Sequence, residues 1–288
     1  MNSAVKNIPL VLRSARLVLW LPILVNVGVL SFLLTHSWQD GCVLGLSLSC
    51  VAAFGFLIND VWDLRVDQDN HAGKLESASK HVLSLAVGFA VFFLVAGLAL
   101  SAFLGMKAGL AMFTVAAGLA AYTFWVRPQI VLANILSAIL SSTPVWLPNV
   151  VFGHTPGIPQ WIIIVVSIAM LLGREIIFDV ADFYGDARAK RRTLPILFGK
   201  QMATRIAVAW QLSACALLTV WSVMAVSGWS PVSRLMLWVL MVVFALLVVP
   251  VNVSLFTRPD DATLIHSFTS RTRIAMLLLP FIMLAFMS

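Results

Sequence analysis

Charged residues are scarce in this sequence, and their scarcity excludes a water-soluble fold. Only 11% of the 288 residues are charged and 61% are hydrophobic, whereas soluble domains carry about 25% charged residues. Cysteine is also scarce. The three cysteines lie in apolar stretches and have the spacing of neither a zinc site nor a disulfide framework. We therefore expect an integral membrane protein whose cysteines are packing residues.

Long apolar runs recur along the whole sequence. A helix of about 20 apolar residues crosses the hydrocarbon core, because a helix pairs its own backbone polar groups there. No polar linker or low-complexity tract interrupts the pattern, so we expect one all-α transmembrane domain over residues 1–288. The runs predict about nine membrane-spanning helices, at residues 16–36, 41–61, 82–105, 106–126, 129–152, 158–178, 202–226, 232–257 and 268–287.

The net charge of +7 indicates membrane orientation rather than nucleic-acid binding, because cytoplasmic loops are enriched in Lys and Arg. With a cytoplasmic N-terminus and alternating loops, every basic residue except Lys107 and Arg234 falls on the cytoplasmic side. We expect a multi-pass protein of the inner or plasma membrane if the source is bacterial. Every acidic residue except Asp40 falls on the same side, and a rule about basic residues does not explain that.

The acidic residues form two clusters, each at the end of a predicted span. Asn59, Asp63 and Asp67 are four residues apart, and Asp179, Asp182 and Asp186 are three or four apart, so each set lies along one face of a continuing helix, with Asp60 beside the first face. The first cluster follows the second span and contains Asn59, Asp60, Asp63 and Asp67. The second follows the sixth span and contains Asp179, Asp182 and Asp186.

Crowded carboxylates repel one another and are costly beside a membrane, so they indicate a bound cation. Oxygen donors without nearby Cys or His favour Mg²⁺, which takes one or two carboxylates and completes its shell with water and phosphate. Basic residues that follow the clusters are candidate phosphate ligands, and we favour Lys74 and Arg188, with Lys190 beside them. The alternative is that the acidic residues form a solvated loop. For a single cluster, a solvated loop and a metal site would be equally good interpretations.

The two clusters resemble the signature motifs of the UbiA superfamily of intramembrane prenyltransferases. The family's first motif, Asn-Asp-x-x-Asp-x-x-x-Asp, is matched by Asn59 through Asp67, and its second resembles the stretch from Gly173 to Pro195. A weaker likeness involves Tyr122, Arg127 and Asn134, where Arg127 replaces the usual Lys. The chain also departs from the family after the first motif, where Asn70-His71-Ala72-Gly73-Lys74 replaces an Arg-Pro-rich segment.

The resemblance implies helices around a central cavity that opens to the cytoplasmic side, with an active site there. A prenyl diphosphate would bind through Mg²⁺, and its isoprenyl group would pass to an aromatic or other lipophilic acceptor. The implied metal ligands are the seven residues of the two clusters. The implied catalytic residues are Asp63, Asp182, Tyr122 and Arg127, and the implied substrate-binding residues are Arg16, Lys74, Arg188, Lys190 and Asn134.

Two other functions fit the same residues. In a terpene cyclase of this family the substrate's own double bond would attack the cation, and no acceptor would be needed. An ion or solute transporter would place its carboxylates near the bilayer midplane, whereas these lie at span ends. Among the remaining polar residues, Asn26 and Gln211 are expected to face the protein interior. The segments from Arg258 to Asp261 and from His266 to Arg273 are expected to form the last cytoplasmic loop.

Overall fold

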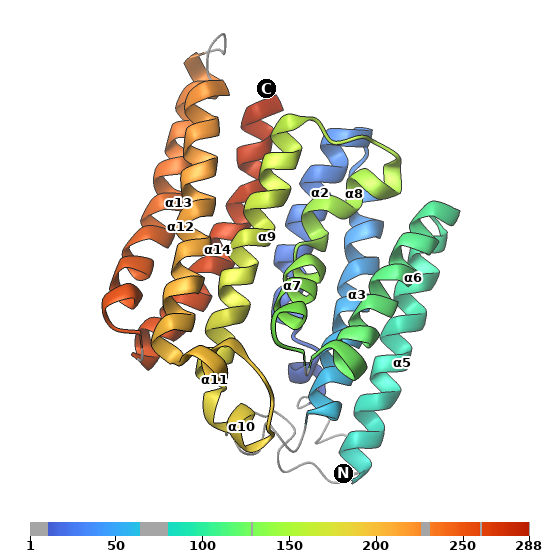
Figure 1. Cartoon of the computed structure of the whole chain (residues 1–288). Coiled ribbons are helices and arrows are strands. Elements are labelled where there is room, and N and C mark those ends of the chain that lie inside the picture. The colour runs from blue at the N-terminus through green and yellow to red at the C-terminus, as the bar shows by residue number, and fades with distance from the viewer. Residues whose placement is uncertain (1–10, 64–79, 128, 226–230, 260, 288) are drawn as a thin grey trace, which may run out of the picture.

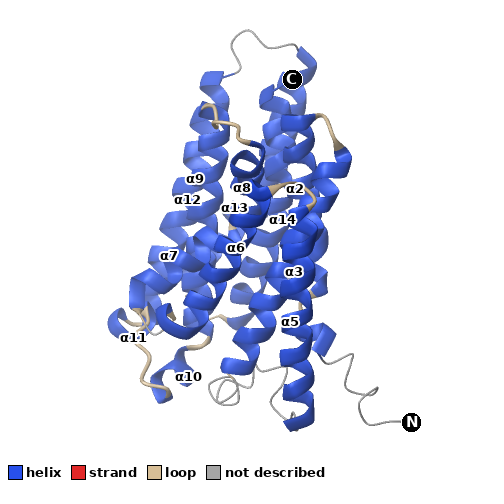
Figure 2. Ribbon diagram, turned by 90° about the vertical axis from the view of Figure 1, so that its right-hand side faces the viewer, coloured by secondary structure: helices blue, strands red, loops and turns tan. Residues whose placement is uncertain are grey.

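The structure, a computed structural model, describes residues 11–63, 80–127, 129–225, 231–259 and 261–287. This part of the chain contains helices and no strand (Figures 1 and 2). A short 3₁₀ helix η1 (Leu17–Leu19) precedes the long helices, and the π-helical segment η2 (Tyr122–Val126) follows α6. The α-helices are α2 (Trp20–Thr35), α3 (Trp38–Trp62), α5 (Lys80–Ala102), α6 (Met106–Ala121), α7 (Ile130–Ser141), α8 (Thr143–Phe152), α9 (Ile158–Ala181), α10 (Phe183–Arg188), α11 (Leu194–Phe198), α12 (Lys200–Ala225), α13 (Pro231–Thr257) and α14 (Ala262–Met287).

The membrane spans predicted from the sequence are confirmed. In the described residues eight segments are long and apolar enough to cross a membrane. A ninth span forms if α7 and α8, which bend by 62° at their junction, are counted as one. The last predicted loop was wrong in extent, because α13 runs to Thr257 and α14 already begins at Ala262. The stretch from 262 to 273 is therefore helical.

The bend between α7 and α8 follows from Pro144. Proline has no N–H and its ring clashes with the carbonyl four residues earlier, so α7 stops before it. Side chains pair the carbonyls that are freed. Thr143 donates to Leu140 O at 2.5 Å, and the Trp146 indole donates to Ile139 O at 3.2 Å. In a bilayer such pairing is what makes a break in a spanning helix tolerable.

Close helix packing depends on small residues. A Cβ added at Gly173 in α9 would lie 2.7 Å from the Ala207 carbonyl oxygen of α12, and one at Gly41 would lie 3.0 Å from Gly28. Helices in membranes associate through such close contacts because lipid provides no hydrophobic drive between them.

A buried polar network ties four helices together, as expected for Gln211. Its amide donates to Met170 O of α9 at 3.1 Å and to Thr272 of α14 at 2.9 Å. Its oxygen accepts from Asn252 of α13 at 3.0 Å. Gln211 and Asn252 are fully buried. The network therefore fixes α9, α12, α13 and α14 as one group.

A cavity of about 650 Å³ lies between the helices, with walls from α2, α3, α6, α7, α8, α9 and α14. The described residues that line it include none from α5, α12 or α13. Figure 1 shows α10 and α11 at one end of the bundle, beyond the end of α9. The end of α3 lies at this same end of the bundle, which we call the motif end, because Arg191 from the loop after α10 contacts Asp63.

Candidate active site

The first acidic motif forms the end of α3. Asn59 and Asp60 lie in its last turn, and the N–H of Asp63 donates to the Asn59 carbonyl at 2.9 Å as the helix ends. Asp63 is 1% exposed. Asp60 accepts a hydrogen bond from Arg16 at 3.2 Å through Oδ1, while its Oδ2 is buried and accepts none within the described residues. Asp67, the fourth predicted ligand, lies outside the described residues.

The second acidic motif lies where α9 gives way to α10. Asp179 in the last turn of α9 accepts a hydrogen bond from Asn134 of α7 at 2.9 Å. Asp182 is the residue between the two helices, and Asp186 lies within α10 with 3% of its surface exposed. Asp179, Asp182 and Asp186 all line the cavity. Helical spacing therefore brings these three carboxylates to one cavity wall.

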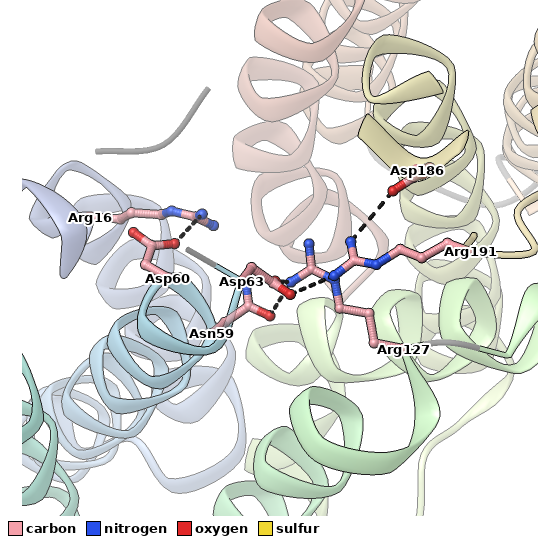
Figure 3. Close-up of polar contacts among 7 residues, drawn as sticks. All are labelled: Arg16, Asn59, Asp60, Asp63, Arg127, Asp186 and Arg191. Atoms are coloured by element: carbon pink, nitrogen blue, oxygen red, sulfur yellow. Dashed lines mark hydrogen bonds and ion pairs between the residues drawn. The ribbon is translucent and has the colours of Figure 1, made fainter. Parts of the chain in front are cut away.

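Two arginines contact the first motif, and one of them also contacts the second (Figure 3). Arg191 contacts Asp63 at 2.6 Å and Asp186 at 3.4 Å, so one guanidinium bridges the end of α3 and α10. Arg127 forms an ion pair with Asp63 and donates to Asn59 Oδ1 at 2.5 Å. Both arginines line the cavity. They provide two fixed donor groups beside the carboxylates.

The π-helical turn of η2 accounts for the placement of Tyr122 and Arg127. The Arg127 N–H donates to the Tyr122 carbonyl at 2.9 Å, a bond between residues five apart. In an α-helix such residues would point about 140° apart. The wider turn reduces that angle, and both side chains line the cavity. Single π turns inside helices occur frequently at functional sites.

Further charged residues lie along α9, deeper than the acidic motifs. Ser137 of α7 donates to Glu175 Oε2 at 2.8 Å, and Arg174 pairs with Glu175 Oε1 at 2.8 Å. Arg273 of α14 also lines the cavity. No role is predicted from the sequence for Arg174, Glu175 or Arg273. The available signal was a charge inside an apolar span, which in membrane proteins marks a functional site by default.

Electrostatics at the motif end favours a bound cation. Burial, together with the charge of Asp186, raises the pKa of Asp182 to about 6. Burial also raises the pKa of Asp186, against the opposing effect of Arg191 and Arg127. Burial and the neighbouring Arg191 lower the pKa of Arg127 to about 10. The negative charge of the ionised carboxylates is thus only partly balanced by the arginines of the protein.

The donor set at the motif end fits Mg²⁺. It consists of carboxylate and amide oxygens, the ligands that this ion prefers, and one buried carboxylate oxygen of Asp60 has no described partner. Within the described residues, no three His, Cys, Asp or Glu side chains are grouped closely enough to hold an ion by themselves. Mg²⁺ does not require such a group, since it binds through one or two carboxylates and substrate phosphate.

Only some of the predicted phosphate ligands lie at the cavity. Arg16 and Asn134 line the cavity, as does Arg191. Arg188 and Lys190 are exposed and are not among the lining residues, so the structure brings their neighbour Arg191 to the site instead. Lys74 lies outside the described residues.

Known proteins share both the sequence pattern and the fold. The digeranylgeranylglyceryl phosphate synthase of Pyrococcus abyssi (strain GE5 / Orsay) is 29% identical over 160 residues, which is 55% of this chain and 56% of the relative. The synthase of the same name from Methanocaldococcus jannaschii is 30% identical over 181 residues, 60% of this chain and 62% of the relative. The chain thus matches about three fifths of the length of these relatives.

The solved structure of a UbiA homolog from Archaeoglobus fulgidus bound to DMAPP and Mg²⁺ has the same fold. It superposes with a TM-score of 0.68 at 20% identity, over 95% of this chain and 98% of the homolog. The profile of the UbiA prenyltransferase family matches residues 18–282. With both motifs at one end of an all-helical bundle, this chain belongs to the UbiA prenyltransferase family.

Proposed function

We propose that the protein is an Mg²⁺-dependent prenyltransferase that moves an isoprenyl group from a prenyl diphosphate to an aromatic or other lipophilic acceptor. The observation that carries the proposal is the contact of Arg191 with both Asp63 and Asp186 beside a cavity with many apolar residues in its walls. Family membership and the names of the relatives favour transfer over cyclisation or transport.

The polar residues at the motif end would hold the diphosphate. Arg127 and Arg191 present guanidinium groups whose fork geometry matches phosphate oxygens. The carboxylates of both motifs would hold Mg²⁺, which supplies positive charge to the diphosphate as it departs. Because these groups are held by the ends of α3, η2 and α10, they are in place before the carbon–oxygen bond breaks.

The cavity beyond the motif end suits the isoprenyl chain. Leu48, Val115, Leu119 and Leu171 are among its apolar lining residues. An apolar wall excludes the water that would otherwise capture an allylic cation. Tyr122 is a lining aromatic, and its ring face can stabilise such a cation. Attack by the acceptor on the cation then forms the new bond, and the acceptor loses a proton.

We also propose that the chain forms one domain over residues 1–288 and that the motif end faces the cytoplasm. The second proposal is supported by the basic residues at that end, because cytoplasmic segments are enriched in Lys and Arg. Arg188, Lys190, Arg191 and Arg192 all follow the second motif.

Product analysis tests the proposed reaction. Purified protein in lipid nanodiscs would receive geranyl, farnesyl or geranylgeranyl diphosphate, each with and without candidate acceptors, and products would be identified by mass spectrometry. We expect prenylated acceptor only with Mg²⁺, and loss of product after chelation. Asp261→Asn is the matched control, because Asp261 lies outside the cavity lining. Full activity after chelation, or hydrocarbon products without acceptor, would contradict the proposal.

A further inference from the structure

The cavity ends at the same depth on two of its helices. On α3 the lining residue farthest from the motif end is Leu48, eleven residues before Asn59. On α9 it is Leu171, eleven residues before Asp182. At 1.5 Å per residue, each lies about 16 Å from the acidic motif of its own helix. We call this far end the floor, and its depth limits the length of a tail that lies along these helices.

The floor lies where α2 and α3 come together. Gly45 is about one turn beyond Leu48 on α3, and a Cβ added there would lie 3.0 Å from a methyl carbon of Leu24 on α2. A Cβ added at Gly41, a further turn away, would lie 3.0 Å from the Gly28 backbone. Helices that pack so closely leave no space for a ligand between them. The cavity therefore stops at Leu48 on this side.

The start of α8 contributes to the floor from another side. It is turned by the 62° bend after α7, and α8 packs against α2 and α6. Thr143, Pro144 and Val145 line the cavity, and Val145 is 4% exposed. Figure 1 shows α8 in the half of the bundle away from α10 and α11. The bent pair thus closes the cavity at the end opposite the acidic motifs.

One face of α3 runs from the first acidic motif to the floor. Its members are three or four residues apart and therefore share a face, and all of them line the cavity: Asn59, Gly55, Ala52 and Leu48. Beyond Phe56, which is less than one turn from Asn59, Leu48 is the first large side chain of α3 to line the cavity. It is 3% exposed. The face is thus open at Ala52 and blocked at Leu48.

We propose that Leu48 sets the length limit of the isoprenyl group and that Ala52 leaves room for its last unit. This inference rests on the proposed function, since it assigns the chain length of the prenyl diphosphate in that reaction. With the diphosphate at the acidic motifs, the tail would run along α3 to the floor. An extended chain of carbon–carbon bonds of about 1.5 Å advances about 1.3 Å per bond. A path of about 16 Å therefore holds roughly twelve bonds, which is about three isoprene units.

A floor of fixed depth predicts how affinity depends on tail length. Each methylene group that is buried strengthens binding about fourfold. One methylene group too many in a closed apolar pocket is discriminated against by about tenfold to two-hundredfold. Affinity should therefore rise with each isoprene unit that fits, and fall with the first unit that would pass Leu48.

Binding of a series of tail lengths tests the limit without turnover. The ligands are the geranyl, farnesyl, geranylgeranyl and geranylfarnesyl S-thiolodiphosphates, in which sulfur replaces the bridging oxygen to suppress ionisation. Each would be titrated with Mg²⁺ into the protein in neutral detergent, and bound ligand counted by native mass spectrometry. We expect the geranylfarnesyl analogue to bind at least tenfold more weakly than the farnesyl analogue. An affinity that keeps rising up to the geranylfarnesyl analogue would overturn the inference.

Variants of α3 should move the limit in opposite directions. Ala52→Leu places a large side chain about 10 Å from Asn59 and should weaken the farnesyl analogue at least tenfold relative to the geranyl analogue. Leu48→Ala should strengthen the geranylfarnesyl analogue about tenfold relative to the farnesyl analogue, and Leu48→Val should shift it less in the same direction. Leu44→Ala is the matched control, because Leu44 is fully buried on the same helix but does not line the cavity. If Ala52→Leu and Leu48→Val keep the length preference of Leu44→Ala, Leu48 does not set the limit.

Binding and product formation together separate this inference from the proposed function. A protein whose length preference shifts in Ala52→Leu, but which forms no prenylated acceptor from any prenyl diphosphate, keeps the length limit and loses the prenyltransferase assignment. A protein that prenylates its acceptor equally well with all four tail lengths, in wild type and in Ala52→Leu alike, keeps the reaction and loses the length limit.

Discussion

Replacing Asp63 and Asp182 by asparagine should change stability in opposite directions. Asp63 is 1% exposed and pairs with both Arg127 and Arg191. Its neutralisation leaves two neighbouring guanidinium groups without their shared anion, and removing one partner of a buried ion pair costs about 3–5 kcal/mol. The two arginine side chains are 18% and 16% exposed, so the lower part of that range applies.

Asp182 is in the opposite situation. Its side chain makes no ion pair or hydrogen bond within the described residues, and its pKa is raised from 3.8 to about 6 by burial and by Asp186. A raised carboxyl pKa means that the ionised form opposes folding at neutral pH. At 1.36 kcal/mol per pKa unit, Asp182→Asn should stabilise the metal-free protein by up to roughly 3 kcal/mol.

Unfolding of the metal-free protein in neutral detergent measures both changes. Asp261→Asn is the control, because Asp261 accepts hydrogen bonds at the start of α14, where asparagine also caps a helix. Added Mg²⁺ should stabilise wild type more than Asp182→Asn, since a ligand stabilises the state that binds it. The reasoning fails if Asp182→Asn destabilises the metal-free protein as much as Asp63→Asn, or if Mg²⁺ stabilises both variants as much as wild type.

Three other predictions concern the motifs, the buried network and the topology. Asp63→Ala and Asp182→Ala should each remove most product formation. The double variant should be little worse than either single variant in the same assay, because the effects of groups that act together are non-additive. A double variant whose loss of activity equals the product of the two single losses would contradict this. Gln211→Leu should lower the free energy of unfolding by about 1–3 kcal/mol by leaving buried partners unpaired, while the KM for prenyl diphosphate stays unchanged. In a background without native cysteines, Lys190→Cys should be labelled from the cytoplasm and His154→Cys from the opposite side, and labelling of both from one side would refute the topology.

The spans could be predicted because a bilayer accepts few backbone conformations. Hydropathy predicts nine segments, and the described residues contain eight candidate spans and, where the fifth segment was expected, a bent pair of helices. The bend could not be predicted, because the fifth span contains both Pro144 and Pro148, and only Pro144 lies at a helix junction, in the first turn of α8. Pro148 lies in the middle of α8. Around Pro144, hydroxyl and indole donors pair the carbonyls that the break leaves free.

The acidic motifs could be placed from spacing, but their cationic partners could not. Arg188, Lys190, Arg191 and Arg192 are equivalent in the sequence. The structure selects Arg191 because α10 ends at Arg188 and Lys190 adopts a left-handed conformation with φ of 55°. The chain reverses there, and the Arg191 N–H donates to the Asp186 carbonyl at 2.9 Å. A non-glycine residue with positive φ is uncommon, and sequence alone does not indicate where one occurs.

The charge at the motif end predicts how the prenyl diphosphate binds. The motif end has Arg127 and Arg191 among at least four carboxylates, so a diphosphate can approach only with metal ions that offset the negative charge. Under the proposed function, binding of prenyl diphosphate therefore depends on Mg²⁺. Titration of prenyl diphosphate with and without chelator measures this dependence, and equally strong binding after chelation would contradict it.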